Sequence, residues 1–188
     1  MEKKAIRKII RELKKDIIPS LRQGDAISTL EETVFSKVEL LHEFMCSRNI
    51  LMYHSLDDEF PTHDTIACWA ALKNIFLPRV CGDDLEILPF APGDGGIRDG
   101  AYGIKEPQGE NPVPPAEIDL IIVPAMAFDP CGNRLGRGKG FYDRLLRQTH
   151  ATCIGVAFDF QLLDALPTDS HDIKMDYIFT PNYSIHIT

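Results

Sequence analysis

Apolar residues recur at helical spacing in several parts of the chain and predict its helices. Over residues 2–17, isoleucine and leucine return every three or four positions with lysine and arginine between them, which predicts an amphipathic helix that ends before Pro19. Ser28 is a candidate N-cap of a second helix, with Glu31 in the capping-box position, and Thr62 is a candidate N-cap of a third. The predicted helices after the first are 28–46, 62–73, 139–149 and a short one near 160–165.

Short, continuous apolar runs predict the strands of a buried sheet. Residues 118–123 are almost entirely aliphatic, as expected of a parallel strand with both faces covered. A glycine-rich segment, a predicted helix and another apolar run at 152–158 follow, an order that predicts a parallel pair with a right-handed crossover. The pattern therefore predicts an α/β fold with a mostly parallel central sheet, whose other strands are 50–54, 75–80, 85–89 and 177–180.

Nothing in the sequence divides the chain into separate parts. Its 188 residues fit a single domain over 1–188, and no repeat or low-complexity tract is visible. Residues 91–117 are rich in glycine and proline and poor in aliphatic residues, which predicts a long loop. Long loops within compact domains are usually functional or mobile, so this segment is a candidate border of a site.

Charge and cysteine content narrow the classes of partner. The formal net charge of −8 argues against a general nucleic-acid binder. The five cysteines are widely spread without metal-binding spacing, which favours reduced thiols in the cytoplasm over disulfides or a zinc site. No secretory signal is visible, and the longest apolar run, near 120–128, is too short to span a bilayer. We therefore expect a soluble cytoplasmic protein with neither a nucleic-acid nor a membrane partner.

The segment 133–143 carries the clearest chemical signal in the chain. Glycines alternate with Arg137 and Lys139, and Arg134 precedes them, against an acidic background. Alternating glycines let backbone N–H groups converge on an anion, and a helix that begins near Gly140 points its positive end at the same place. The alternative is a tight turn between strand and helix, but such a turn gains nothing from three concentrated cations. We interpret the segment as a phosphate cradle, although it matches neither the P-loop nor the dinucleotide fingerprint.

Charged residues elsewhere are weaker candidates on their own. Asp143 could bind Mg²⁺ together with phosphate oxygens, or it could simply stabilise the start of a helix. Position alone makes Asp172 a loop residue. Lys3 and Arg7 lie one helical turn apart and can reach one anion, with a solvated basic face as the preferred alternative. Glu59 follows the first predicted strand, where α/β sites often lie, but an acidic loop explains it equally well.

Aromatic and histidine residues add no fixed pattern. Tyr102 and Phe128 lie near glycine-rich segments and could stack on a flat heterocycle, although isolated aromatic residues more often pack in the core. His54 and His63 could act in acid–base chemistry, but no spacing supports that role. No Ser/His/Asp or Cys/His arrangement can be argued from the sequence.

Taken together, these pieces resemble the 5-formyltetrahydrofolate cyclo-ligases, also called methenyltetrahydrofolate synthetases. The strongest and most specific resemblance lies in residues 128–143, FDPCGNRLGRGKGFYD. The resemblance covers nearly the whole chain, and its segments fall in the expected order. The other segments are Lys3-x-x-x-Arg7, Glu59-Phe60-Pro61-Thr62, Gly103–Pro107, Asp119–Pro124 and His171–Asp176.

The resemblance implies a fold and a reaction. The implied fold is a three-layer α/β/α arrangement related to the sugar-phosphate isomerase and CoA-transferase folds. The implied reaction converts 5-formyltetrahydrofolate and MgATP to 5,10-methenyltetrahydrofolate, ADP and phosphate: the formyl oxygen attacks the γ-phosphate to give an iminium phosphate, N10 closes the ring, and phosphate leaves. Because an amide-type oxygen is a poor nucleophile, positioning and charge neutralisation must provide most of the catalysis.

Roles for individual residues also follow from the resemblance. Arg137 and Lys139 are the expected catalytic cations. Asp143 and Asp172 are the expected Mg²⁺ ligands. The folate is expected to contact Leu56, Glu59, Tyr102 and Phe141. The expected ATP site consists of Lys3, Arg7, Arg134, Leu135, Gly136, Arg137, Gly138, Lys139, Gly140 and Tyr142.

The chain departs from the family pattern at two positions. Some members carry an acid in place of Pro61, and some carry Tyr in place of Phe141, so a polar contact with the folate is expected to be missing at each. Two other functions remain open: a sugar-phosphate or CoA-ester enzyme that uses the cradle without hydrolysing ATP, and a regulatory domain that binds a nucleotide without turnover. We expect a monomer or a weak homodimer.

Overall fold

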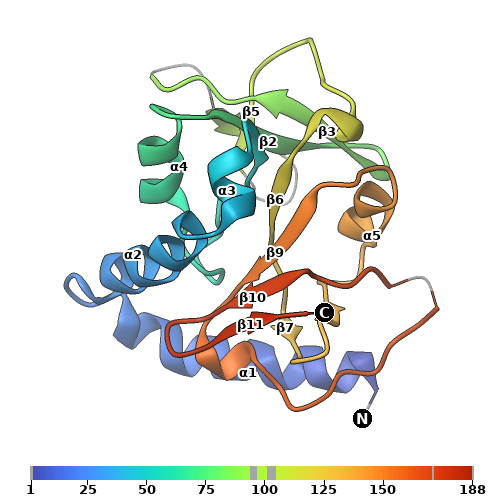
Figure 1. Ribbon diagram of the computed structural model, residues 1–188. Helices are drawn as coiled ribbons and strands as arrows, with labels where there is room; N and C mark the ends of the chain where they lie inside the picture. The colour runs from blue at the N-terminus through green and yellow to red at the C-terminus, as the bar shows by residue number, and fades with distance from the viewer. Residues whose placement is uncertain (1, 94–96, 101–104, 171, 188) are drawn as a thin grey trace.

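The computed structural model describes residues 2–93, 97–100, 105–170 and 172–187, which contain both helices and strands (Figure 1). The helices are α1 (Lys3–Leu21), α2 (Ala26–Glu39), α3 (His42–Cys46), α4 (His63–Trp69), α5 (Phe141–Leu146) and the 3₁₀ turns η2 (Pro115–Glu117) and η3 (Asp159–Gln161). The strands are β1 (Asn49–Leu51), β2 (Asn74–Cys81), β3 (Asp84–Pro89), β4 (Ile97–Asp99), β5 (Lys105–Pro107), β6 (Leu120–Val123), β7 (Ala127–Phe128), β8 (Arg134–Leu135), β9 (Thr152–Val156), β10 (Tyr177–Phe179) and β11 (Ser184–His186).

Seven of the strands form one sheet in the order β11-β10-β9-β6-β1-β2-β3. The five inner strands are parallel, whereas the edge strands β11 and β3 run antiparallel to their neighbours. At the centre, Ile50 lies in register with Ile75 on one side and Leu120 on the other. The mostly parallel α/β fold predicted from the sequence is confirmed, including the parallel pairing of β6 with β9. The carboxyl ends of the five inner strands consequently lie along one edge of the sheet.

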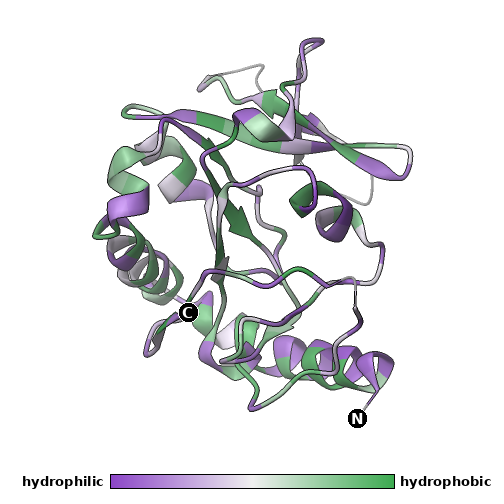
Figure 2. Ribbon diagram, turned by 45° about the vertical axis from the view of Figure 1, so that its right-hand side comes forward, coloured by the Kyte–Doolittle hydropathy of each residue, from purple (hydrophilic) through white to green (hydrophobic). Residues whose placement is uncertain are grey.

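Helices pack on both faces of this sheet. On one face, α2, α3 and α4 bury Phe35, Phe44 and Trp69 against the inner strands. The other face is covered by α5 (Figure 1). Leu145 and Leu146 of that helix are buried against the sheet. The strands between these two layers are the most hydrophobic part of the chain, as their green colour in Figure 2 shows. Sheet and helices are therefore held together by two apolar layers, one on each face.

The first helix differs from its prediction in length and in its buried face. It continues two residues beyond Pro19 to Leu21, because proline removes only one backbone N–H and the last turn is held by the burial of Ile18. Ile9, predicted to be apolar and inward, is 47% exposed. A lysine, Lys14, instead occupies a buried position, in place of the solvated basic face expected for it. The buried side chains, one every four residues, are Ile6, Ile10, Lys14 and Ile18.

The predicted helix over 28–46 is two helices, α2 and α3, and its capping prediction is wrong. Ser28 lies inside α2 rather than at its start. Glu31 is buried, and its carboxylate accepts the backbone N–H of Thr65 at 2.8 Å, in the first turn of α4. Thr62 is the N-cap residue of α4, as predicted, but its hydroxyl donates to a carbonyl outside that helix. Glu31 therefore satisfies a helix start that the local sequence leaves open.

Five short strands have no counterpart in the predicted pattern. β4 pairs with β5 inside the segment expected to be a loop, β7 pairs with β8 next to the glycine-rich segment, and β11 closes one sheet edge. Strands of two or three residues hold too few side chains to show an alternation in the sequence. Within the described ranges, no helix combines the length and the apolar composition that crossing a membrane requires.

Candidate functional site

A cleft of about 510 Å³ opens at the carboxyl ends of β1 and β6, at the centre of the parallel sheet. This is the edge at which ligands bind in open α/β sheets. The N-terminal half of α1, the segment after β1, the glycine-rich loop, Asp169 and Asp172 all contribute to its walls. Tyr102 lies outside the described residues, and all the other predicted site residues line the cleft: Lys3, Arg7, Leu56, Glu59, Arg134, Leu135, Gly136, Arg137, Gly138, Lys139, Gly140, Phe141, Tyr142, Asp143 and Asp172.

A buried carboxylate, Asp129, fixes the base of the glycine-rich loop. It is 1% exposed, and its two oxygens accept the backbone N–H groups of Cys131, Asn133 and Leu166 and the side-chain amide of Asn133, at 2.8–3.1 Å. These four hydrogen bonds hold the chain around the carboxylate in one conformation. Sequence reasoning missed this role, although Asp129 lies in the strongest segment of the family resemblance.

Glycines are required where the loop passes close to its own side chains. Gly138 and Gly140 have φ of +106° and +71°, which side-chain-bearing residues rarely adopt. A Cβ on Gly136 would lie 2.8 Å from Nη1 of Arg134. The loop is anchored to the first helix as well, because Nε of Arg7 donates to the carbonyl of Gly136 at 2.8 Å. The loop is thus a built structure rather than a simple connection between β8 and α5.

Carboxylates pair with two of the loop's arginines in the cleft. Arg134 donates to Asp143 at 2.5 Å, and the Arg134 side chain is only 4% exposed. Arg137 donates to Asp58 at 2.5 Å and to Glu59 at 3.0 Å. Burial acts to lower the pKa of Arg137, but the two carboxylates outweigh it and raise that pKa. Both arginines are therefore held as cations that face the cleft.

The two predicted metal ligands reach the same cleft from separate segments. Asp143 is paired with Arg134, whereas Asp172 accepts Nζ of Lys3 at 2.6 Å. Asp169, which the sequence analysis did not single out, accepts the same ammonium at 2.8 Å. Burial acts to lower the pKa of Lys3, but these two carboxylates raise it. Within the described ranges, no three His, Cys, Asp or Glu side chains are arranged to hold a metal, so a cation here needs further oxygens from a bound molecule.

Two buried polar atoms of the cleft have no hydrogen-bond partner among the described residues. They are Nε of Arg134 and the hydroxyl of Tyr142. Burial raises the pKa of Tyr142, so its hydroxyl keeps its proton and remains a donor. Buried donors without acceptors are rare and costly in folded proteins. Both atoms belong to residues predicted to bind the nucleotide, and both lack an acceptor within the described part of the chain.

The predicted folate residues Leu56, Glu59 and Phe141 also line the cleft. Glu59 accepts the backbone N–H of Leu56 at 3.0 Å through one oxygen and Arg137 through the other. The ring of Phe141 is covered by the guanidinium of Arg144, 5.5 Å from its centroid. Phe128, a candidate for stacking on a ligand, is fully buried instead, and its ring lies where a Cβ on Gly155 would be. The core interpretation of Phe128 is therefore the right one.

The two candidate histidines lie next to each other close to the cleft. The rings of His54 and His63 lie 3.9 Å apart, and His54 lines the cleft. A ring nitrogen of His63 lies 3.0 Å from the carbonyl of Ser55.

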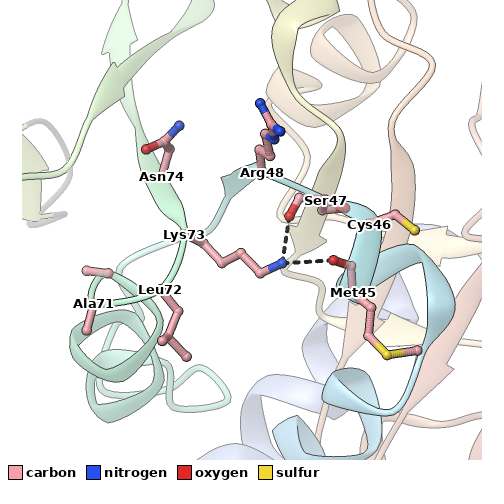
Figure 3. Close-up of a pocket in the computed structure, with 9 residues that line it drawn as sticks. Met45, Cys46, Ser47, Arg48, Ala71, Leu72, Lys73 and Asn74 are labelled. Carbon is pink, nitrogen blue, oxygen red and sulfur yellow. Dashed lines mark hydrogen bonds between the residues drawn. The ribbon is translucent and has the colours of Figure 1, made fainter.

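A second cavity, of about 680 Å³, lies at the amino ends of β1 and β2, remote from the loop (Figure 3). The ammonium of Lys73, which lines this cavity, donates hydrogen bonds to the backbone carbonyls of Phe44, Met45 and Ser47, at 2.7–3.2 Å. None of the predicted site residues lines it. The larger cavity is therefore not the candidate site, because it lies at the opposite end of the strands from the glycine-rich loop.

Known proteins of similar sequence and fold identify the family. Residues 1–181 match the 5-formyltetrahydrofolate cyclo-ligase family. The chain is 32% identical over 183 residues to the 5-formyltetrahydrofolate cyclo-ligase of Haemophilus influenzae, covering 93% of this chain and 95% of the relative, and 27% identical over 196 residues to that of Mus musculus, covering 89% and 91%. The NMR structure of Aquifex aeolicus 5,10-methenyltetrahydrofolate synthetase superposes with a TM-score of 0.86 at 32% identity, covering 100% of this chain and 93% of that one. The chain therefore belongs to the 5-formyltetrahydrofolate cyclo-ligase family of ligases.

Proposed function

We propose that the protein cyclises 5-formyltetrahydrofolate to 5,10-methenyltetrahydrofolate with consumption of MgATP and release of ADP and phosphate. The formyl oxygen attacks the γ-phosphate and displaces ADP, and N10 of the folate then attacks the activated carbon, so that phosphate leaves. Family membership supports the overall reaction. We propose in addition that the reaction uses ATP and Mg²⁺ and passes through a phosphorylated intermediate.

The observation that carries the proposal is the pair of buried donors without acceptors, Nε of Arg134 and the hydroxyl of Tyr142. They line a cleft in which the arginines of the loop are held by carboxylates that an entering phosphate can replace. A nucleotide phosphate supplies acceptors for both donors at once. Exchange of carboxylate for phosphate leaves the number of ion pairs unchanged, which keeps the cost of desolvation low.

The proposed roles divide along the cleft. Arg137 and Lys139 neutralise the charge that develops on the transferring phosphoryl group, and Lys3 and Arg7 bind the phosphates from α1. Leu56, Glu59 and Phe141 contact the folate, as does Tyr102 in the undescribed segment. The remaining nucleotide contacts come from Arg134, Leu135, Gly136, Gly138, Gly140 and Tyr142.

Mg²⁺ fits the donor set if the nucleotide completes it. Asp143 and Asp172 supply one carboxylate each, which matches the preference of Mg²⁺ for few protein ligands plus phosphate oxygens. The ion, when bound, neutralises phosphate charge. In the structure Asp143 is paired with Arg134, and Asp172 is paired with Lys3. When the two carboxylates bind the metal, Arg134 and Lys3 are released and can turn toward the phosphates. We further propose a cytoplasmic location, supported by the five free thiols.

A spectroscopic turnover assay tests the function. Absorbance in the methenyl-folate band is expected to rise only when protein, 5-formyltetrahydrofolate and MgATP are all present. Lys139→Ala is expected to lower kcat/KM for MgATP about 100-fold, because one stabilising cation is lost from the transition state. The control is Lys8→Ala, which removes an exposed lysine outside the cleft and is expected to keep the parent's rate.

Two outcomes would count against these assignments. A purified, folded parent that gives no ATP-dependent absorbance would reject the function. A normal rate for Lys139→Ala would reject the role of Lys139 alone. Thermal unfolding separates the other classes: a sugar-phosphate or CoA-ester enzyme, which the family match does not favour, has no reason to be stabilised by both MgATP and a folate. A nucleotide sensor would be stabilised by MgATP without turnover.

A further inference from the structure

Lys14 is a charged residue at a buried position of α1 whose buried neighbours along the helix are apolar. It lies on the buried stripe of α1 between Ile10 and Ile18, and it is 3% exposed. A lysine in such a position is rare, because burying an ammonium costs several kcal/mol even after relaxation. Its Nζ has no hydrogen-bond partner among the described residues, and the nearest carboxylate oxygen, on Asp58, is 3.6 Å away. Apolar packing alone gives no reason for this residue.

Asp58 lies between Lys14 and the glycine-rich loop. One of its oxygens accepts Arg137 at 2.5 Å, and the other faces Lys14. Burial acts to raise the pKa of Asp58, but Arg137 and Lys14 outweigh it and lower that pKa, so the carboxylate is charged. Burial lowers the pKa of Lys14, and Arg137 adds to this, while Asp58 opposes it. The two cations thus share one carboxylate and repel each other.

We propose that Lys14 is a positioning residue that replaces Arg137 at Asp58 when Arg137 turns to the nucleotide phosphate. This inference rests on the function proposed above and goes beyond it, since Lys14 does not line the cleft. Without Lys14, the departure of Arg137 would leave Asp58 half-buried without a cation. Because Lys14 is already paired with Asp58 at 3.6 Å, a small shift shortens that ion pair, and the departure of Arg137 relieves the repulsion between the two cations. Arg137 is consequently released to the phosphate at lower cost.

The test is Lys14→Met, which keeps the length of the side chain and restores the apolar stripe. The variant is expected to fold and to unfold at the parent's temperature or above, because buried ion pairs replaced by apolar residues are often neutral or stabilising. Its KM for MgATP is expected to rise about fivefold to tenfold, because Asp58 then holds Arg137 more firmly, while its KM for the folate changes less than about twofold. The control is Lys15→Met, which removes the neighbouring exposed lysine.

A second substitution separates positioning from a purely structural role. Adding Asp58→Asn to Lys14→Met removes the carboxylate that retains Arg137, and the KM for MgATP is expected to return toward the parent's. Asp58→Asn alone is expected to lower that KM, which gives a reading even if Lys14→Met does not fold. The proposal is overturned if Lys14→Met has the same MgATP KM as Lys15→Met, or if the double variant gives no rescue. An inactive parent would instead reject the proposed function, and calorimetric Kd values for MgATP then decide the Lys14 proposal in the same way.

Discussion

Two side chains of the cleft, those of Arg134 and Tyr142, have hydrogen-bond donors that the described part of the protein does not use. Arg134 is nearly buried, yet its Nε has no acceptor among the described residues, although its Nη2 is paired with Asp143. The hydroxyl of Tyr142 is in the same state, with the guanidinium of Arg134 5.7 Å from its ring centroid. Folding rarely leaves such groups unsatisfied without a reason. We infer that these donors are kept for a ligand, at some cost in stability.

Tyr142→Phe tests this inference because stability and activity are expected to move in different directions. Loss of an unpaired buried hydroxyl is expected to leave the free energy of unfolding unchanged or to raise it by up to about 1 kcal/mol. The KM for MgATP is expected to rise about fivefold to tenfold, the worth of one hydrogen bond. Urea unfolding and the turnover assay provide the two measurements.

Tyr53→Phe is the matched control for the stability measurement. Its hydroxyl is also buried but donates to the carbonyl of Phe60 at 2.8 Å, so its loss is expected to cost about 1 kcal/mol. A Tyr142→Phe variant that loses as much stability as Tyr53→Phe, with an unaltered KM for MgATP, would show that the Tyr142 hydroxyl serves the fold and not the ligand.

At the scale of elements, the site depends on how the glycine-rich loop passes into α5. Gly140 is the N-cap residue of α5 and has φ of +71°. The carbonyl of the preceding Lys139 accepts Nη1 of Arg144 at 3.2 Å, which ties the loop to the helix. A Cβ on Gly140 would lie 2.8 Å from that same nitrogen. A side chain at Gly140 would therefore displace the end of the Arg144 side chain from the carbonyl of Lys139.

Gly140→Ala is therefore expected to reduce both stability and activity. The left-handed conformation costs alanine about 1–2 kcal/mol. Displacement of Arg144 is expected to shift Lys139 and to lower kcat at least about tenfold, since small misplacements of catalytic groups have large effects. Gly24→Ala is the control: it has nearly the same φ, +69°, with nothing within 4 Å of an added Cβ, and it lies outside the cleft. Equal stability losses with equal rates for the two variants would contradict this expectation.

Elements were predictable from the sequence where one local pattern decides them. The inner strands and the existence of α1 follow from the spacing of apolar residues, although the face that α1 buries does not. The predictions were wrong where a contact between residues far apart in the sequence determines the bounds or the cap of a helix. The helix over 28–46 breaks so that Phe44 packs on Trp69 at 4.5 Å between ring centroids, and Glu31 caps a helix that begins more than thirty residues later. Such contacts have no counterpart in local spacing.

The candidate site shows the same division. The loop 133–143 was visible because glycines and cations alternate, a pattern with direct chemical meaning. Asp58, Lys14 and Asp169 were not visible, because their roles come from pairing with residues far away in the chain. The acidic loop 57–59 carried a weak signal through Glu59 alone. The part of the site that could not be predicted from the sequence is therefore its long-range charge pairing, and not any single motif.

On the scale of the whole molecule, the buried thiol and phenol groups determine how the fold responds to alkali. Burial raises the pKa of Cys153, in the inner strand β9, to about 12. It also raises the pKa values of Tyr53 and Tyr142. In the unfolded chain these thiol and phenol groups release their protons near their ordinary pKa values, whereas the folded protein retains those protons to higher pH. The unfolded state therefore binds fewer protons at high pH, and stability falls as pH rises.

The first of these groups to act as pH rises is Cys153. Its unfolded thiol ionises near pH 9, so between about pH 9 and 10 it is expected to reduce the free energy of unfolding by up to about 1.4 kcal/mol per pH unit. Cys153→Ala lowers stability at neutral pH by leaving a small cavity, but it is expected to flatten this slope. Urea unfolding at half-unit steps from pH 8 to 10 measures the slope, and Cys46→Ala, which removes an exposed thiol, is expected to keep the slope of the parent. A slope that is the same in Cys153→Ala as in the parent would show that the buried thiol is not the group that sets the alkaline limit of the fold.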